Sequence, residues 1–390
     1  MAKTTLTDED RTALRRALEL AERGRGRVSP NPLVGAVLIR DGRTIGEGHH
    51  VELGGLHAEA AALEDCRARG EDPRAATAYM TQEPCAHYGR QPPCAEALVA
   101  AGIARAVIAT DDPSDHASGR GPAALEAAGV EVSWANGAEA DAARRLNQPF
   151  RKWARTGRPL VTLKAAISLD GRTATVAGDS RWISGERSRA LVHRWRAEAD
   201  AVAVGIGTAL ADDPLLTARP VADPAAPGGG TEDAADSRSQ PLRIVFDSAA
   251  RLPLGSRLVA SLDEGPVLVV ASAEAPAGAV GALRETGIEV LIPAGDRPAR
   301  IAAALTELGA RGVNSLILEG GAALAGAFLD AGEIDELRLF VAPIVLGGDG
   351  ARPLAGGEGT ERVGDALRAT EVSCERSGED LLISARLRDW

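Results

Sequence analysis

The chain has 390 residues, a formal net charge of −11 and only 3% aromatic residues. This length exceeds one ordinary core, so two domains are expected. The acidic balance argues against a nucleic-acid-binding surface, although a few arginines could hold a small anionic substrate. No apolar run approaches the roughly 18 residues that span a bilayer, and the N-terminus lacks the apolar block of a signal peptide. We therefore expect a cytoplasmic protein without membrane or nucleic-acid partners.

The first part of the chain alternates between helix and strand patterns. An amphipathic helix is expected over 8–23, a hairpin of strands over 33–40 and 44–50, and a helix over 57–70. The next expected elements are strands at 76–81, 104–112 and 130–134 and helices at 94–102 and 121–129. Strands alternating with helices predict an α/β sheet that is covered on its faces.

The second part repeats this alternation after a helix expected over roughly 138–156. Strands are expected at LVTLKAAIS, DAVAVGIG, LRIVFD, PVLVVAS, IEVLIP, SLILEG, ELRLFVAPIVLG and DLLISARL. We therefore predict domains at 1–150 and 151–390. The segment Pro220–Pro241 is polar, rich in Gly, Pro and Asp and without periodicity, which predicts a disordered surface insertion.

The four cysteines divide into one close-set pair and two isolated residues. In a long cytosolic chain, close-set cysteines act as metal ligands or catalytic groups more often than as disulfides. Only Cys85 and Cys94 are close-set. Cys66 lies in a helix pattern and Cys374 in a strand pattern, and we interpret both as structural.

The close-set pair belongs with HAE at the start of a predicted helix. His57, Cys85 and Cys94 supply one imidazole and two thiolates, which leaves the fourth position of a tetrahedral zinc site open for water. Zinc lowers the pKa of its water to about 7. Glu59 could then move protons from that water to a leaving amine, as in the zinc deaminases with H-x-E and P-C-x-x-C motifs.

The second motif departs from that spacing, because Cys85 and Cys94 are separated by eight residues in PCAHYGRQPPC. The added loop allows the alternative of a closed structural site with His87 as fourth ligand. Glu59 argues against it, because a structural site needs no proton shuttle. We interpret His49 and His50 as polar residues at a strand end rather than as ligands.

The stretches PNPLVGAV, HAEAAAL and EPCAHYGRQPPC resemble the deaminase domain of the riboflavin-biosynthesis bifunctional deaminase–reductases. The resemblance implies a cytidine-deaminase-like, three-layer α/β/α domain. Asn31 either hydrogen-bonds the pyrimidine edge or is a turn residue between two prolines. His87, Tyr88 and Arg90 either contact the substrate phosphate or ribose or form a solvated loop.

Four later stretches resemble the reductase domain of the same family: SLDGR, GDSRWIS, VGIGTALADDPLLTAR and LEGG with its following helix. The resemblance implies an α/β fold like that of dihydrofolate reductase, and NADPH as cofactor. GIGTAL alone lacks the third glycine of a dinucleotide fingerprint, so it is no evidence for a Rossmann site. Glycines at 320–321 would let backbone N–H groups approach a phosphate at a helix start.

The same resemblance assigns residues to the reductase site. NADPH would contact Ala166, Trp182, Thr208, Asp212, Ser248 and the run Gly321, Ala322, Ala323, Leu324, Ala325, Gly326 and Ala327. The substrate would contact Ser180, Arg196, Leu216, Arg219 and Glu319, together with Lys164, whose mid-strand charge requires a partner or ligand. The two arginines suit a sugar phosphate because the guanidinium fork matches phosphate oxygens. Their alternative is an ordinary surface ion pair, and Trp182 could be a core aromatic.

The resemblance covers about residues 8–219 and 241–385 and departs from the family pattern at Gln82, at Ala36 and in the insertion. It implies zinc-dependent deamination of 2,5-diamino-6-ribosylamino-4(3H)-pyrimidinone 5′-phosphate and NADPH-dependent reduction of the ribosyl group to ribityl. It also implies a homo-oligomer formed through the reductase domain. The proton donor of the reduction stays open between Lys164, Asp212 and a water.

Two alternative functions are compatible with parts of this pattern. The deaminase could act on a free nucleoside or on a tRNA adenosine, but the acidic charge and the reductase partner argue against tRNA. The chain could also be a non-catalytic nucleotide-binding protein with a structural zinc. Glu59 argues against a mere binding protein, which has no use for a proton shuttle.

Overall fold

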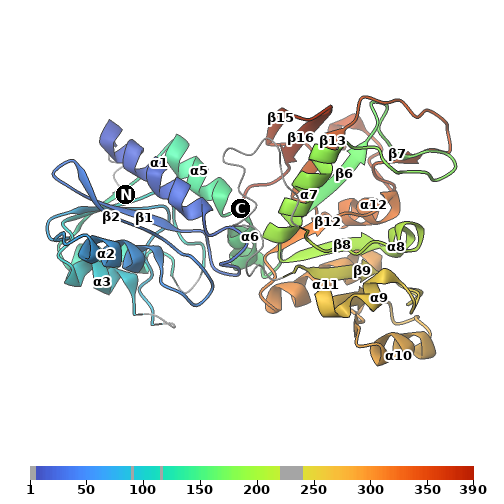
Figure 1. Cartoon of the computed structure of the whole chain (residues 1–390), viewed down its shortest axis with the longest axis horizontal. Helices are drawn as coiled ribbons and strands as arrows, with labels where there is room; N and C mark the ends of the chain where they lie inside the picture. The colour runs from blue at the N-terminus through green and yellow to red at the C-terminus, as the bar shows by residue number, and fades with distance from the viewer. Residues whose placement is uncertain (1–5, 89–91, 115–116, 220–239) are drawn as a thin grey trace. The chain divides into compact units, whose positions relative to one another are not determined.

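The computed structural model describes residues 6–88, 92–114, 117–219 and 240–390. The chain forms two compact units, Met1–Gly157 with Trp390 and Arg158–Asp389 (Figure 1). The boundary predicted from the sequence near residue 150 falls inside helix α6 (Gln148–Thr156). The expected insertion lies outside the described residues, apart from Gln240 and Pro241.

The first unit is a five-stranded sheet in the order β2-β1-β3-β4-β5. Its strands are β1 (Gly35–Arg40), β2 (Arg43–His49), β3 (Thr77–Met80), β4 (Arg105–Ile108) and β5 (Glu131–Trp134). Its helices are α1 (Asp8–Glu22), α2 (Ala58–Ala68), α3 (Cys94–Ala100), α4 (Arg120–Ala127), α5 (Ala138–Leu146) and α6. One core lies between the sheet and α1 and α5, and a second lies between the sheet and α2, α3 and α4 (Figure 1). The predicted three-layer α/β/α arrangement is therefore confirmed.

Glycines in β2 allow helix α2 to lie directly on the sheet. A Cβ at Gly48 would come within 2.3 Å of the Ala62 nitrogen and 2.4 Å of the Ala58 oxygen. A Cβ at Gly46 would come within 2.4 Å of the Ala62 oxygen. Because all three contacts are to helix backbone, only glycine permits this approach. The start of α2, where His57 lies, is fixed by it.

The single helix expected over 138–156 is wrong, because the chain forms α5 and α6 with a break at Asn147. Pro149 is in the first turn of α6, where proline is tolerated because its missing N–H would be unpaired there. The buried Asn147 side chain accepts from the Leu33 N–H at 2.8 Å and donates to the Leu33 carbonyl at 2.9 Å. A distant loop, which no local pattern shows, therefore fixes the break.

The second unit is a nine-stranded mixed sheet in the order β11-β10-β9-β8-β12-β6-β13-β16-β15. Its strands are β6 (Leu160–Ile167), β8 (Ala201–Gly205), β9 (Leu242–Phe246), β10 (Val267–Val270), β11 (Glu289–Leu291), β12 (Ser315–Leu318), β13 (Glu336–Val341), β15 (Glu371–Ser377) and β16 (Asp380–Arg386), and β7 (Arg172–Ala174) pairs with β14 (Arg352–Pro353). The helices are α7 (Glu186–Glu198), α8 (Ile206–Asp212), α9 (Arg257–Ala260), α10 (Ala277–Glu285), α11 (Arg297–Ala310) and α12 (Ala322–Asp330), with 3₁₀ turns at Leu262–Glu264 and Val363–Asp365.

The strands of this sheet run parallel from β11 to β13, and β13, β16 and β15 are antiparallel. Residues of α7 to α10 fill one core cluster, and residues of α11 and α12 fill another. This confirms the predicted α/β class.

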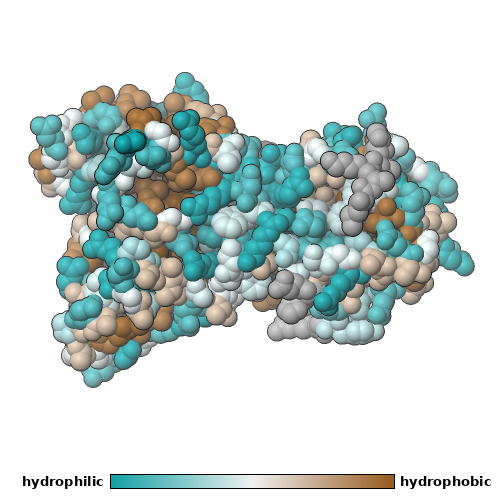
Figure 2. All heavy atoms as spheres, turned by 180° about the vertical axis from the view of Figure 1, so that it is seen from behind, coloured by the Kyte–Doolittle hydropathy of each residue, from teal (hydrophilic) through white to brown (hydrophobic). Residues whose placement is uncertain are grey.

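No described helix has the length and apolar character that a membrane span requires. Figure 2 shows hydrophilic and apolar residues together on one face.

Candidate functional site

Helix α2 positions the first ligand and the acid together. His57 is its N-cap residue, with extended backbone and a side chain that makes no capping hydrogen bond. The imidazole is therefore available for other partners. Glu59 lies in the first turn of the same helix and is 4% exposed.

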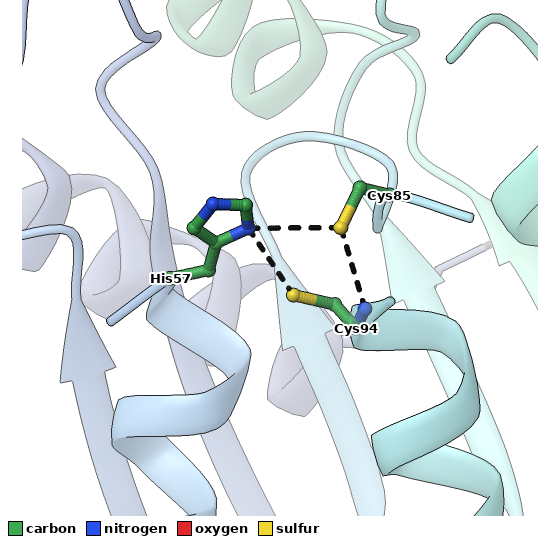
Figure 3. A group of neighbouring side chains, drawn as sticks. All are labelled: His57, Cys85 and Cys94. Carbon is green, nitrogen blue, oxygen red and sulfur yellow. Dashed lines mark hydrogen bonds between the residues drawn. The ribbon is translucent and has the colours of Figure 1, made fainter. Parts of the chain in front are cut away.

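The two sulfurs come from the chain that follows β3. Cys85 lies in the loop after this strand, and Cys94 is the first residue of α3 (Figure 3). The Cys94 N–H points to the Cys85 sulfur at 3.3 Å. The His57 Nδ1 atom lies 3.6 Å from the Cys85 sulfur and 3.4 Å from the Cys94 sulfur. The end of β3 and the start of α3 thus bring both sulfurs close to the imidazole.

These three atoms fit a metal ion. They lie within 4.8 Å of one another, and they form the only such cluster among the described residues. One nitrogen and two sulfurs are ligands that zinc prefers, and three protein ligands leave the fourth position open, as in catalytic sites. His87, the candidate for a closed site, is exposed and lies outside this cluster.

The electrostatics of the cluster favour a thiolate. Hydrogen bonds from Cys94 and His57 outweigh burial and lower the pKa of Cys85 to about 4. The neighbouring Cys85 sulfur and burial raise the pKa of Cys94. The two sulfurs therefore cannot both be ionised at neutral pH without a nearby cation. A divalent metal ion between them would supply that charge.

Glu59 has the protonation behaviour of a proton shuttle. Burial is the largest cause that raises the pKa of this carboxyl to about 7, and the negative charge of Cys85 adds to it. A general acid–base group works best when its pKa lies near the operating pH. Glu59 is not one of the clustered ligands, so its carboxyl is available to exchange protons beside them.

The sequence analysis missed His50, which it interpreted as a strand-end residue. This side chain is 3% exposed, and its ring lies 5.5 Å from that of His57, edge to face. Its Nδ1 atom bonds the Leu56 carbonyl at 2.8 Å, so Nε2 accepts from the Asn31 amide at 3.1 Å. This bond fixes the orientation of Asn31. A histidine seven residues before the first ligand was the available signal.

The long loop between the cysteines contributes little to the cluster. Tyr88 is 75% exposed, and its hydroxyl donates to Glu96 at 2.8 Å. His87 is also exposed. Arg90 lies outside the described residues.

The second unit brings three predicted substrate residues together. Lys164 in β6 and Glu319 after β12 are neighbours because these strands pair in parallel, with Leu163 opposite Leu318. The Lys164 ammonium lies 3.2 Å from the Glu319 carboxylate. Arg196 of α7 donates to both Glu319 oxygens, at 2.6 and 2.9 Å. Burial alone would raise the pKa of Glu319. Arg196 and Lys164 lower it by a larger amount, so the pKa lies below its ordinary value and the carboxyl is ionised.

Two of the three remaining substrate candidates, Leu216 and Arg219, lie on the stretch that follows α8. Leu216 is 2% exposed, and Arg219 is exposed and lies 3.2 Å from the His193 ring. Arg196 also donates to the Thr217 carbonyl at 3.3 Å, which connects this stretch to Glu319. Ser180 is half-buried in the loop before α7.

The predicted cofactor residues are partly brought together. A Cβ at Gly321, the N-cap of α12, would lie 3.5 Å from the Thr208 hydroxyl of α8. The start of α12 and the Thr208 hydroxyl of α8 therefore lie close together. Asp212 accepts from Arg181 through its carbonyl at 2.6 Å. The other predicted residues are Ala166, half-buried in β6, and Trp182 and Ser248, both exposed.

The run from Gly321 to Ala327 contains two environments. Gly321 and the following residues form the start of α12, whose unpaired N–H groups suit a phosphate. Ala325 and Ala327 are instead buried in the core. A Cβ at Gly326 would come within 2.3 Å of the Gly356 backbone, so this glycine permits close packing.

Both units match known protein families. Residues 7–110 match the cytidine and deoxycytidylate deaminase zinc-binding region, and residues 159–383 match the RibD C-terminal domain. The first match agrees with the predicted cytidine-deaminase-like fold.

Several relatives cover nearly the whole chain. The riboflavin biosynthesis protein RibD of Escherichia coli is 41% identical over 378 residues, covering 96% of this chain and 98% of its own. The structure of Acinetobacter baumannii RibD has a TM-score of 0.83 and 36% identity, covering 98% of this chain and 99% of that one. A diaminohydroxyphosphoribosylaminopyrimidine deaminase/5-amino-6-(5-phosphoribosylamino)uracil reductase from Thermotoga maritima has a TM-score of 0.81 and 33% identity, covering 97% and 99%. These similarities include both units together.

Proposed function

Because the chain belongs to the RibD family of bifunctional deaminases and reductases in riboflavin biosynthesis, we propose a specific pair of reactions and the residues that perform them. The first unit deaminates 2,5-diamino-6-ribosylamino-4(3H)-pyrimidinone 5′-phosphate. The second unit reduces the ribosyl group of the product to ribityl with NADPH. The convergence of His57, Cys85 and Cys94 beside the buried Glu59 is the observation that supports this proposal most strongly.

In the deaminase site, His57, Cys85 and Cys94 hold zinc. Zinc, when bound, would lower the pKa of a water to about 7, so that hydroxide would be available to attack the ring carbon at neutral pH. Glu59 takes the proton from this water and passes it to the departing amino group, which leaves as ammonia. The Asn31 amide, oriented by His50, binds the pyrimidine edge.

In the reductase site, the start of α12 and Thr208 would bind a phosphate of NADPH, because a helix N-terminus favours an anion and the Thr208 hydroxyl lies close to Gly321. NADPH, when bound, supplies the hydride. Arg196 and Arg219 bind the sugar phosphate of the substrate. Glu319 holds Lys164 and Arg196 in place. The accompanying proton comes from Lys164, Asp212 or a water.

We also propose that the chain is a cytoplasmic homo-oligomer joined through the second unit. Strand β15 is at one edge of the nine-stranded sheet, and all of its residues except Ser377 are exposed. An exposed edge strand is a surface on which another chain can pair. Sedimentation of the purified protein tests this proposal, since a monomer at micromolar concentration would contradict it.

One preparation tests both reactions. Zinc content is measured on the purified chain, and ammonia release and NADPH absorbance are then followed with the diaminopyrimidine phosphate. We expect one zinc per chain, ammonia release without NADPH, and NADPH oxidation only after deamination. Zinc without ammonia release would favour the non-catalytic binding protein instead. Ammonia release without NADPH oxidation would contradict the reductase assignment alone.

A further inference from the structure

The stretch Leu215–Arg219 has no helix or strand of its own and carries a strained residue. Leu216 has a φ of +58°, in the left-handed region, and is 2% exposed. A buried leucine adopts this conformation only where its surroundings impose it, and such strain is concentrated at functional sites. The hydrogen bonds of the residues beside Leu216 therefore identify the groups that hold it in this conformation.

Three side chains bind this backbone on both sides of Leu216. Arg243 donates to the Leu215 carbonyl at 3.2 Å. Gln240 binds both polar groups of Ala218: it donates to the carbonyl at 2.9 Å and accepts from the N–H at 2.8 Å. The third is Arg196, which bonds the Thr217 carbonyl and the Glu319 carboxylate. The stretch is therefore held by side chains in place of secondary-structure hydrogen bonds.

Arg243 is an unusual residue for the interior of a sheet. It lies in β9, is 0% exposed, and its neighbours Ile244 and Val245 are apolar core residues. Besides Leu215, its guanidinium donates to the Ser261 hydroxyl and carbonyl, both at 2.7 Å, and to the Gly265 carbonyl. No ion pair reaches it from the described part of the chain. Asp263 and Glu264 act on this cation only through longer-range attraction, and its hydrogen-bond partners are neutral. Burying such a cation is costly, and an apolar residue would fill a purely structural position better.

The shape of the guanidinium explains why an arginine occupies this place. Its planar fork directs several donors in fixed directions, so one side chain can join the backbone at Leu215 to the backbone at Ser261 and Gly265. A lysine has a single nitrogen and cannot bond all three segments with the same geometry. The arginine therefore ties the strained stretch to a rigid part of the sheet.

We propose that Arg243 and Gln240 are positioning residues of the reductase, which hold Leu215–Arg219 in the conformation that presents Leu216 and Arg219 to the substrate. This inference rests on the proposed function, because that function assigns Leu216 and Arg219 to substrate binding. Neither positioning residue contacts the substrate itself. Both act by holding the backbone of Leu215–Arg219, which Arg196 also binds.

The test compares Gln240→Ala and Arg243→Lys with a matched control, Arg284→Lys. Arg284 also donates to a backbone carbonyl, that of Val290 at 3.2 Å, but in a different part of the unit. In the two test variants we expect the KM for the pyrimidine substrate to rise about 10-fold, the loss expected for one charged or two neutral hydrogen bonds. In these variants we expect the KM for NADPH and the rate of ammonia release to stay within about twofold of wild type. In the control Arg284→Lys, both KM values and the rate of ammonia release should stay within the same range.

Hydrogen exchange supplies a readout that does not depend on activity. The peptide containing Leu215–Arg219 should exchange faster in both test variants than in wild type, and at the wild-type rate in Arg284→Lys. If Arg243→Lys fails to fold, Gln240→Ala alone decides, because its side chain is only half-buried.

Two results would overturn the inference: unchanged exchange of this peptide in Gln240→Ala, or equal increases in both KM values, which indicate general loosening. A wild-type chain that oxidises no NADPH would instead contradict the proposed function. The exchange result would then still decide whether these side chains hold the stretch.

Discussion

The cluster of His57, Cys85 and Cys94 and the cluster around Glu319 are built in different ways. His57 and Glu59 come from the start of α2, Cys85 from the loop after β3 and Cys94 from the start of α3. Lys164, which lies 155 positions before Glu319, meets it only because β12 pairs with β6. The first site is determined by local sequence and the second by strand order. A single substitution should therefore abolish the first, whereas losses at the second should be graded.

Removing one sulfur should have the largest effect. In Cys94→Ser the cluster loses one sulfur, so we expect zinc loss and ammonia release at background. Reductase activity should stay within about twofold of wild type when the deaminated product is supplied directly. Metal analysis and both assays measure this outcome. Cys374→Ser is the control, because Cys374 is exposed and outside the cluster. A Cys94→Ser protein with full zinc and full activity would show that this sulfur is not a ligand.

Removing the proton shuttle should leave the metal in place. In Glu59→Gln we expect ammonia release to fall by about 10²–10⁴-fold, the range for a general acid–base group. Zinc content should be unchanged, because Glu59 is not among the clustered ligands. Glu64→Gln is the matched control, since Glu64 lies exposed on the same helix. Loss of zinc in Glu59→Gln would assign Glu59 a structural role instead.

At the reductase site, Glu319→Gln should affect stability as well as activity. The substitution leaves Lys164 and Arg196 without their shared carboxylate, and breaking a buried pair costs about 3–5 kcal/mol. Urea unfolding of the second unit measures this change. Glu289→Gln breaks a surface pair with Arg311, in which Glu289 is 54% exposed, and should cost at most about 1 kcal/mol. Equal losses in the two variants would show that the Glu319 cluster contributes no more than a surface pair.

The smallest effect concerns Asp10, which stabilises the first unit away from its metal centre. Burial raises the pKa of Asp10, but hydrogen bonds from Arg105, Thr7 and Tyr79 lower it to about 2, below the ordinary value of 3.8. The unfolded chain therefore binds the proton first as pH falls. The stabilisation is complete above about pH 4 and is lost toward pH 2.

Asp10→Asn removes this titrating group, so unfolding of the first unit should depend less on pH between 4 and 2 than in wild type. The free energy of unfolding at pH 6 should fall by about 1–3 kcal/mol, as expected when a charged hydrogen-bond acceptor is lost. Denaturant unfolding at several pH values measures both. An unchanged pH slope would mean that the pKa of Asp10 is the same in the folded and the unfolded chain.

The features that could be predicted from the sequence are those that depend on residues close together in the chain. The two motifs predicted that His57, Cys85 and Cys94 lie together, and the structure brings them together. The alternation of strands and helices predicted the layers of both units. The sequence did not show that His50 orients Asn31, or that Asn147 ends α5 by bonding Leu33. These contacts join segments that are distant in the chain. Residue type alone does not reveal such a partner.

The close approach of helix α2 to strand β2 bears on how the deaminase site can change during evolution. The backbone contacts at Gly46 and Gly48 leave no room for a methyl group. A larger residue at either position would push helix α2 away from the sheet. His57, at the start of this helix, would then move relative to the two sulfurs. The geometry of the cluster of His57, Cys85 and Cys94 therefore depends partly on two glycines that lie outside it.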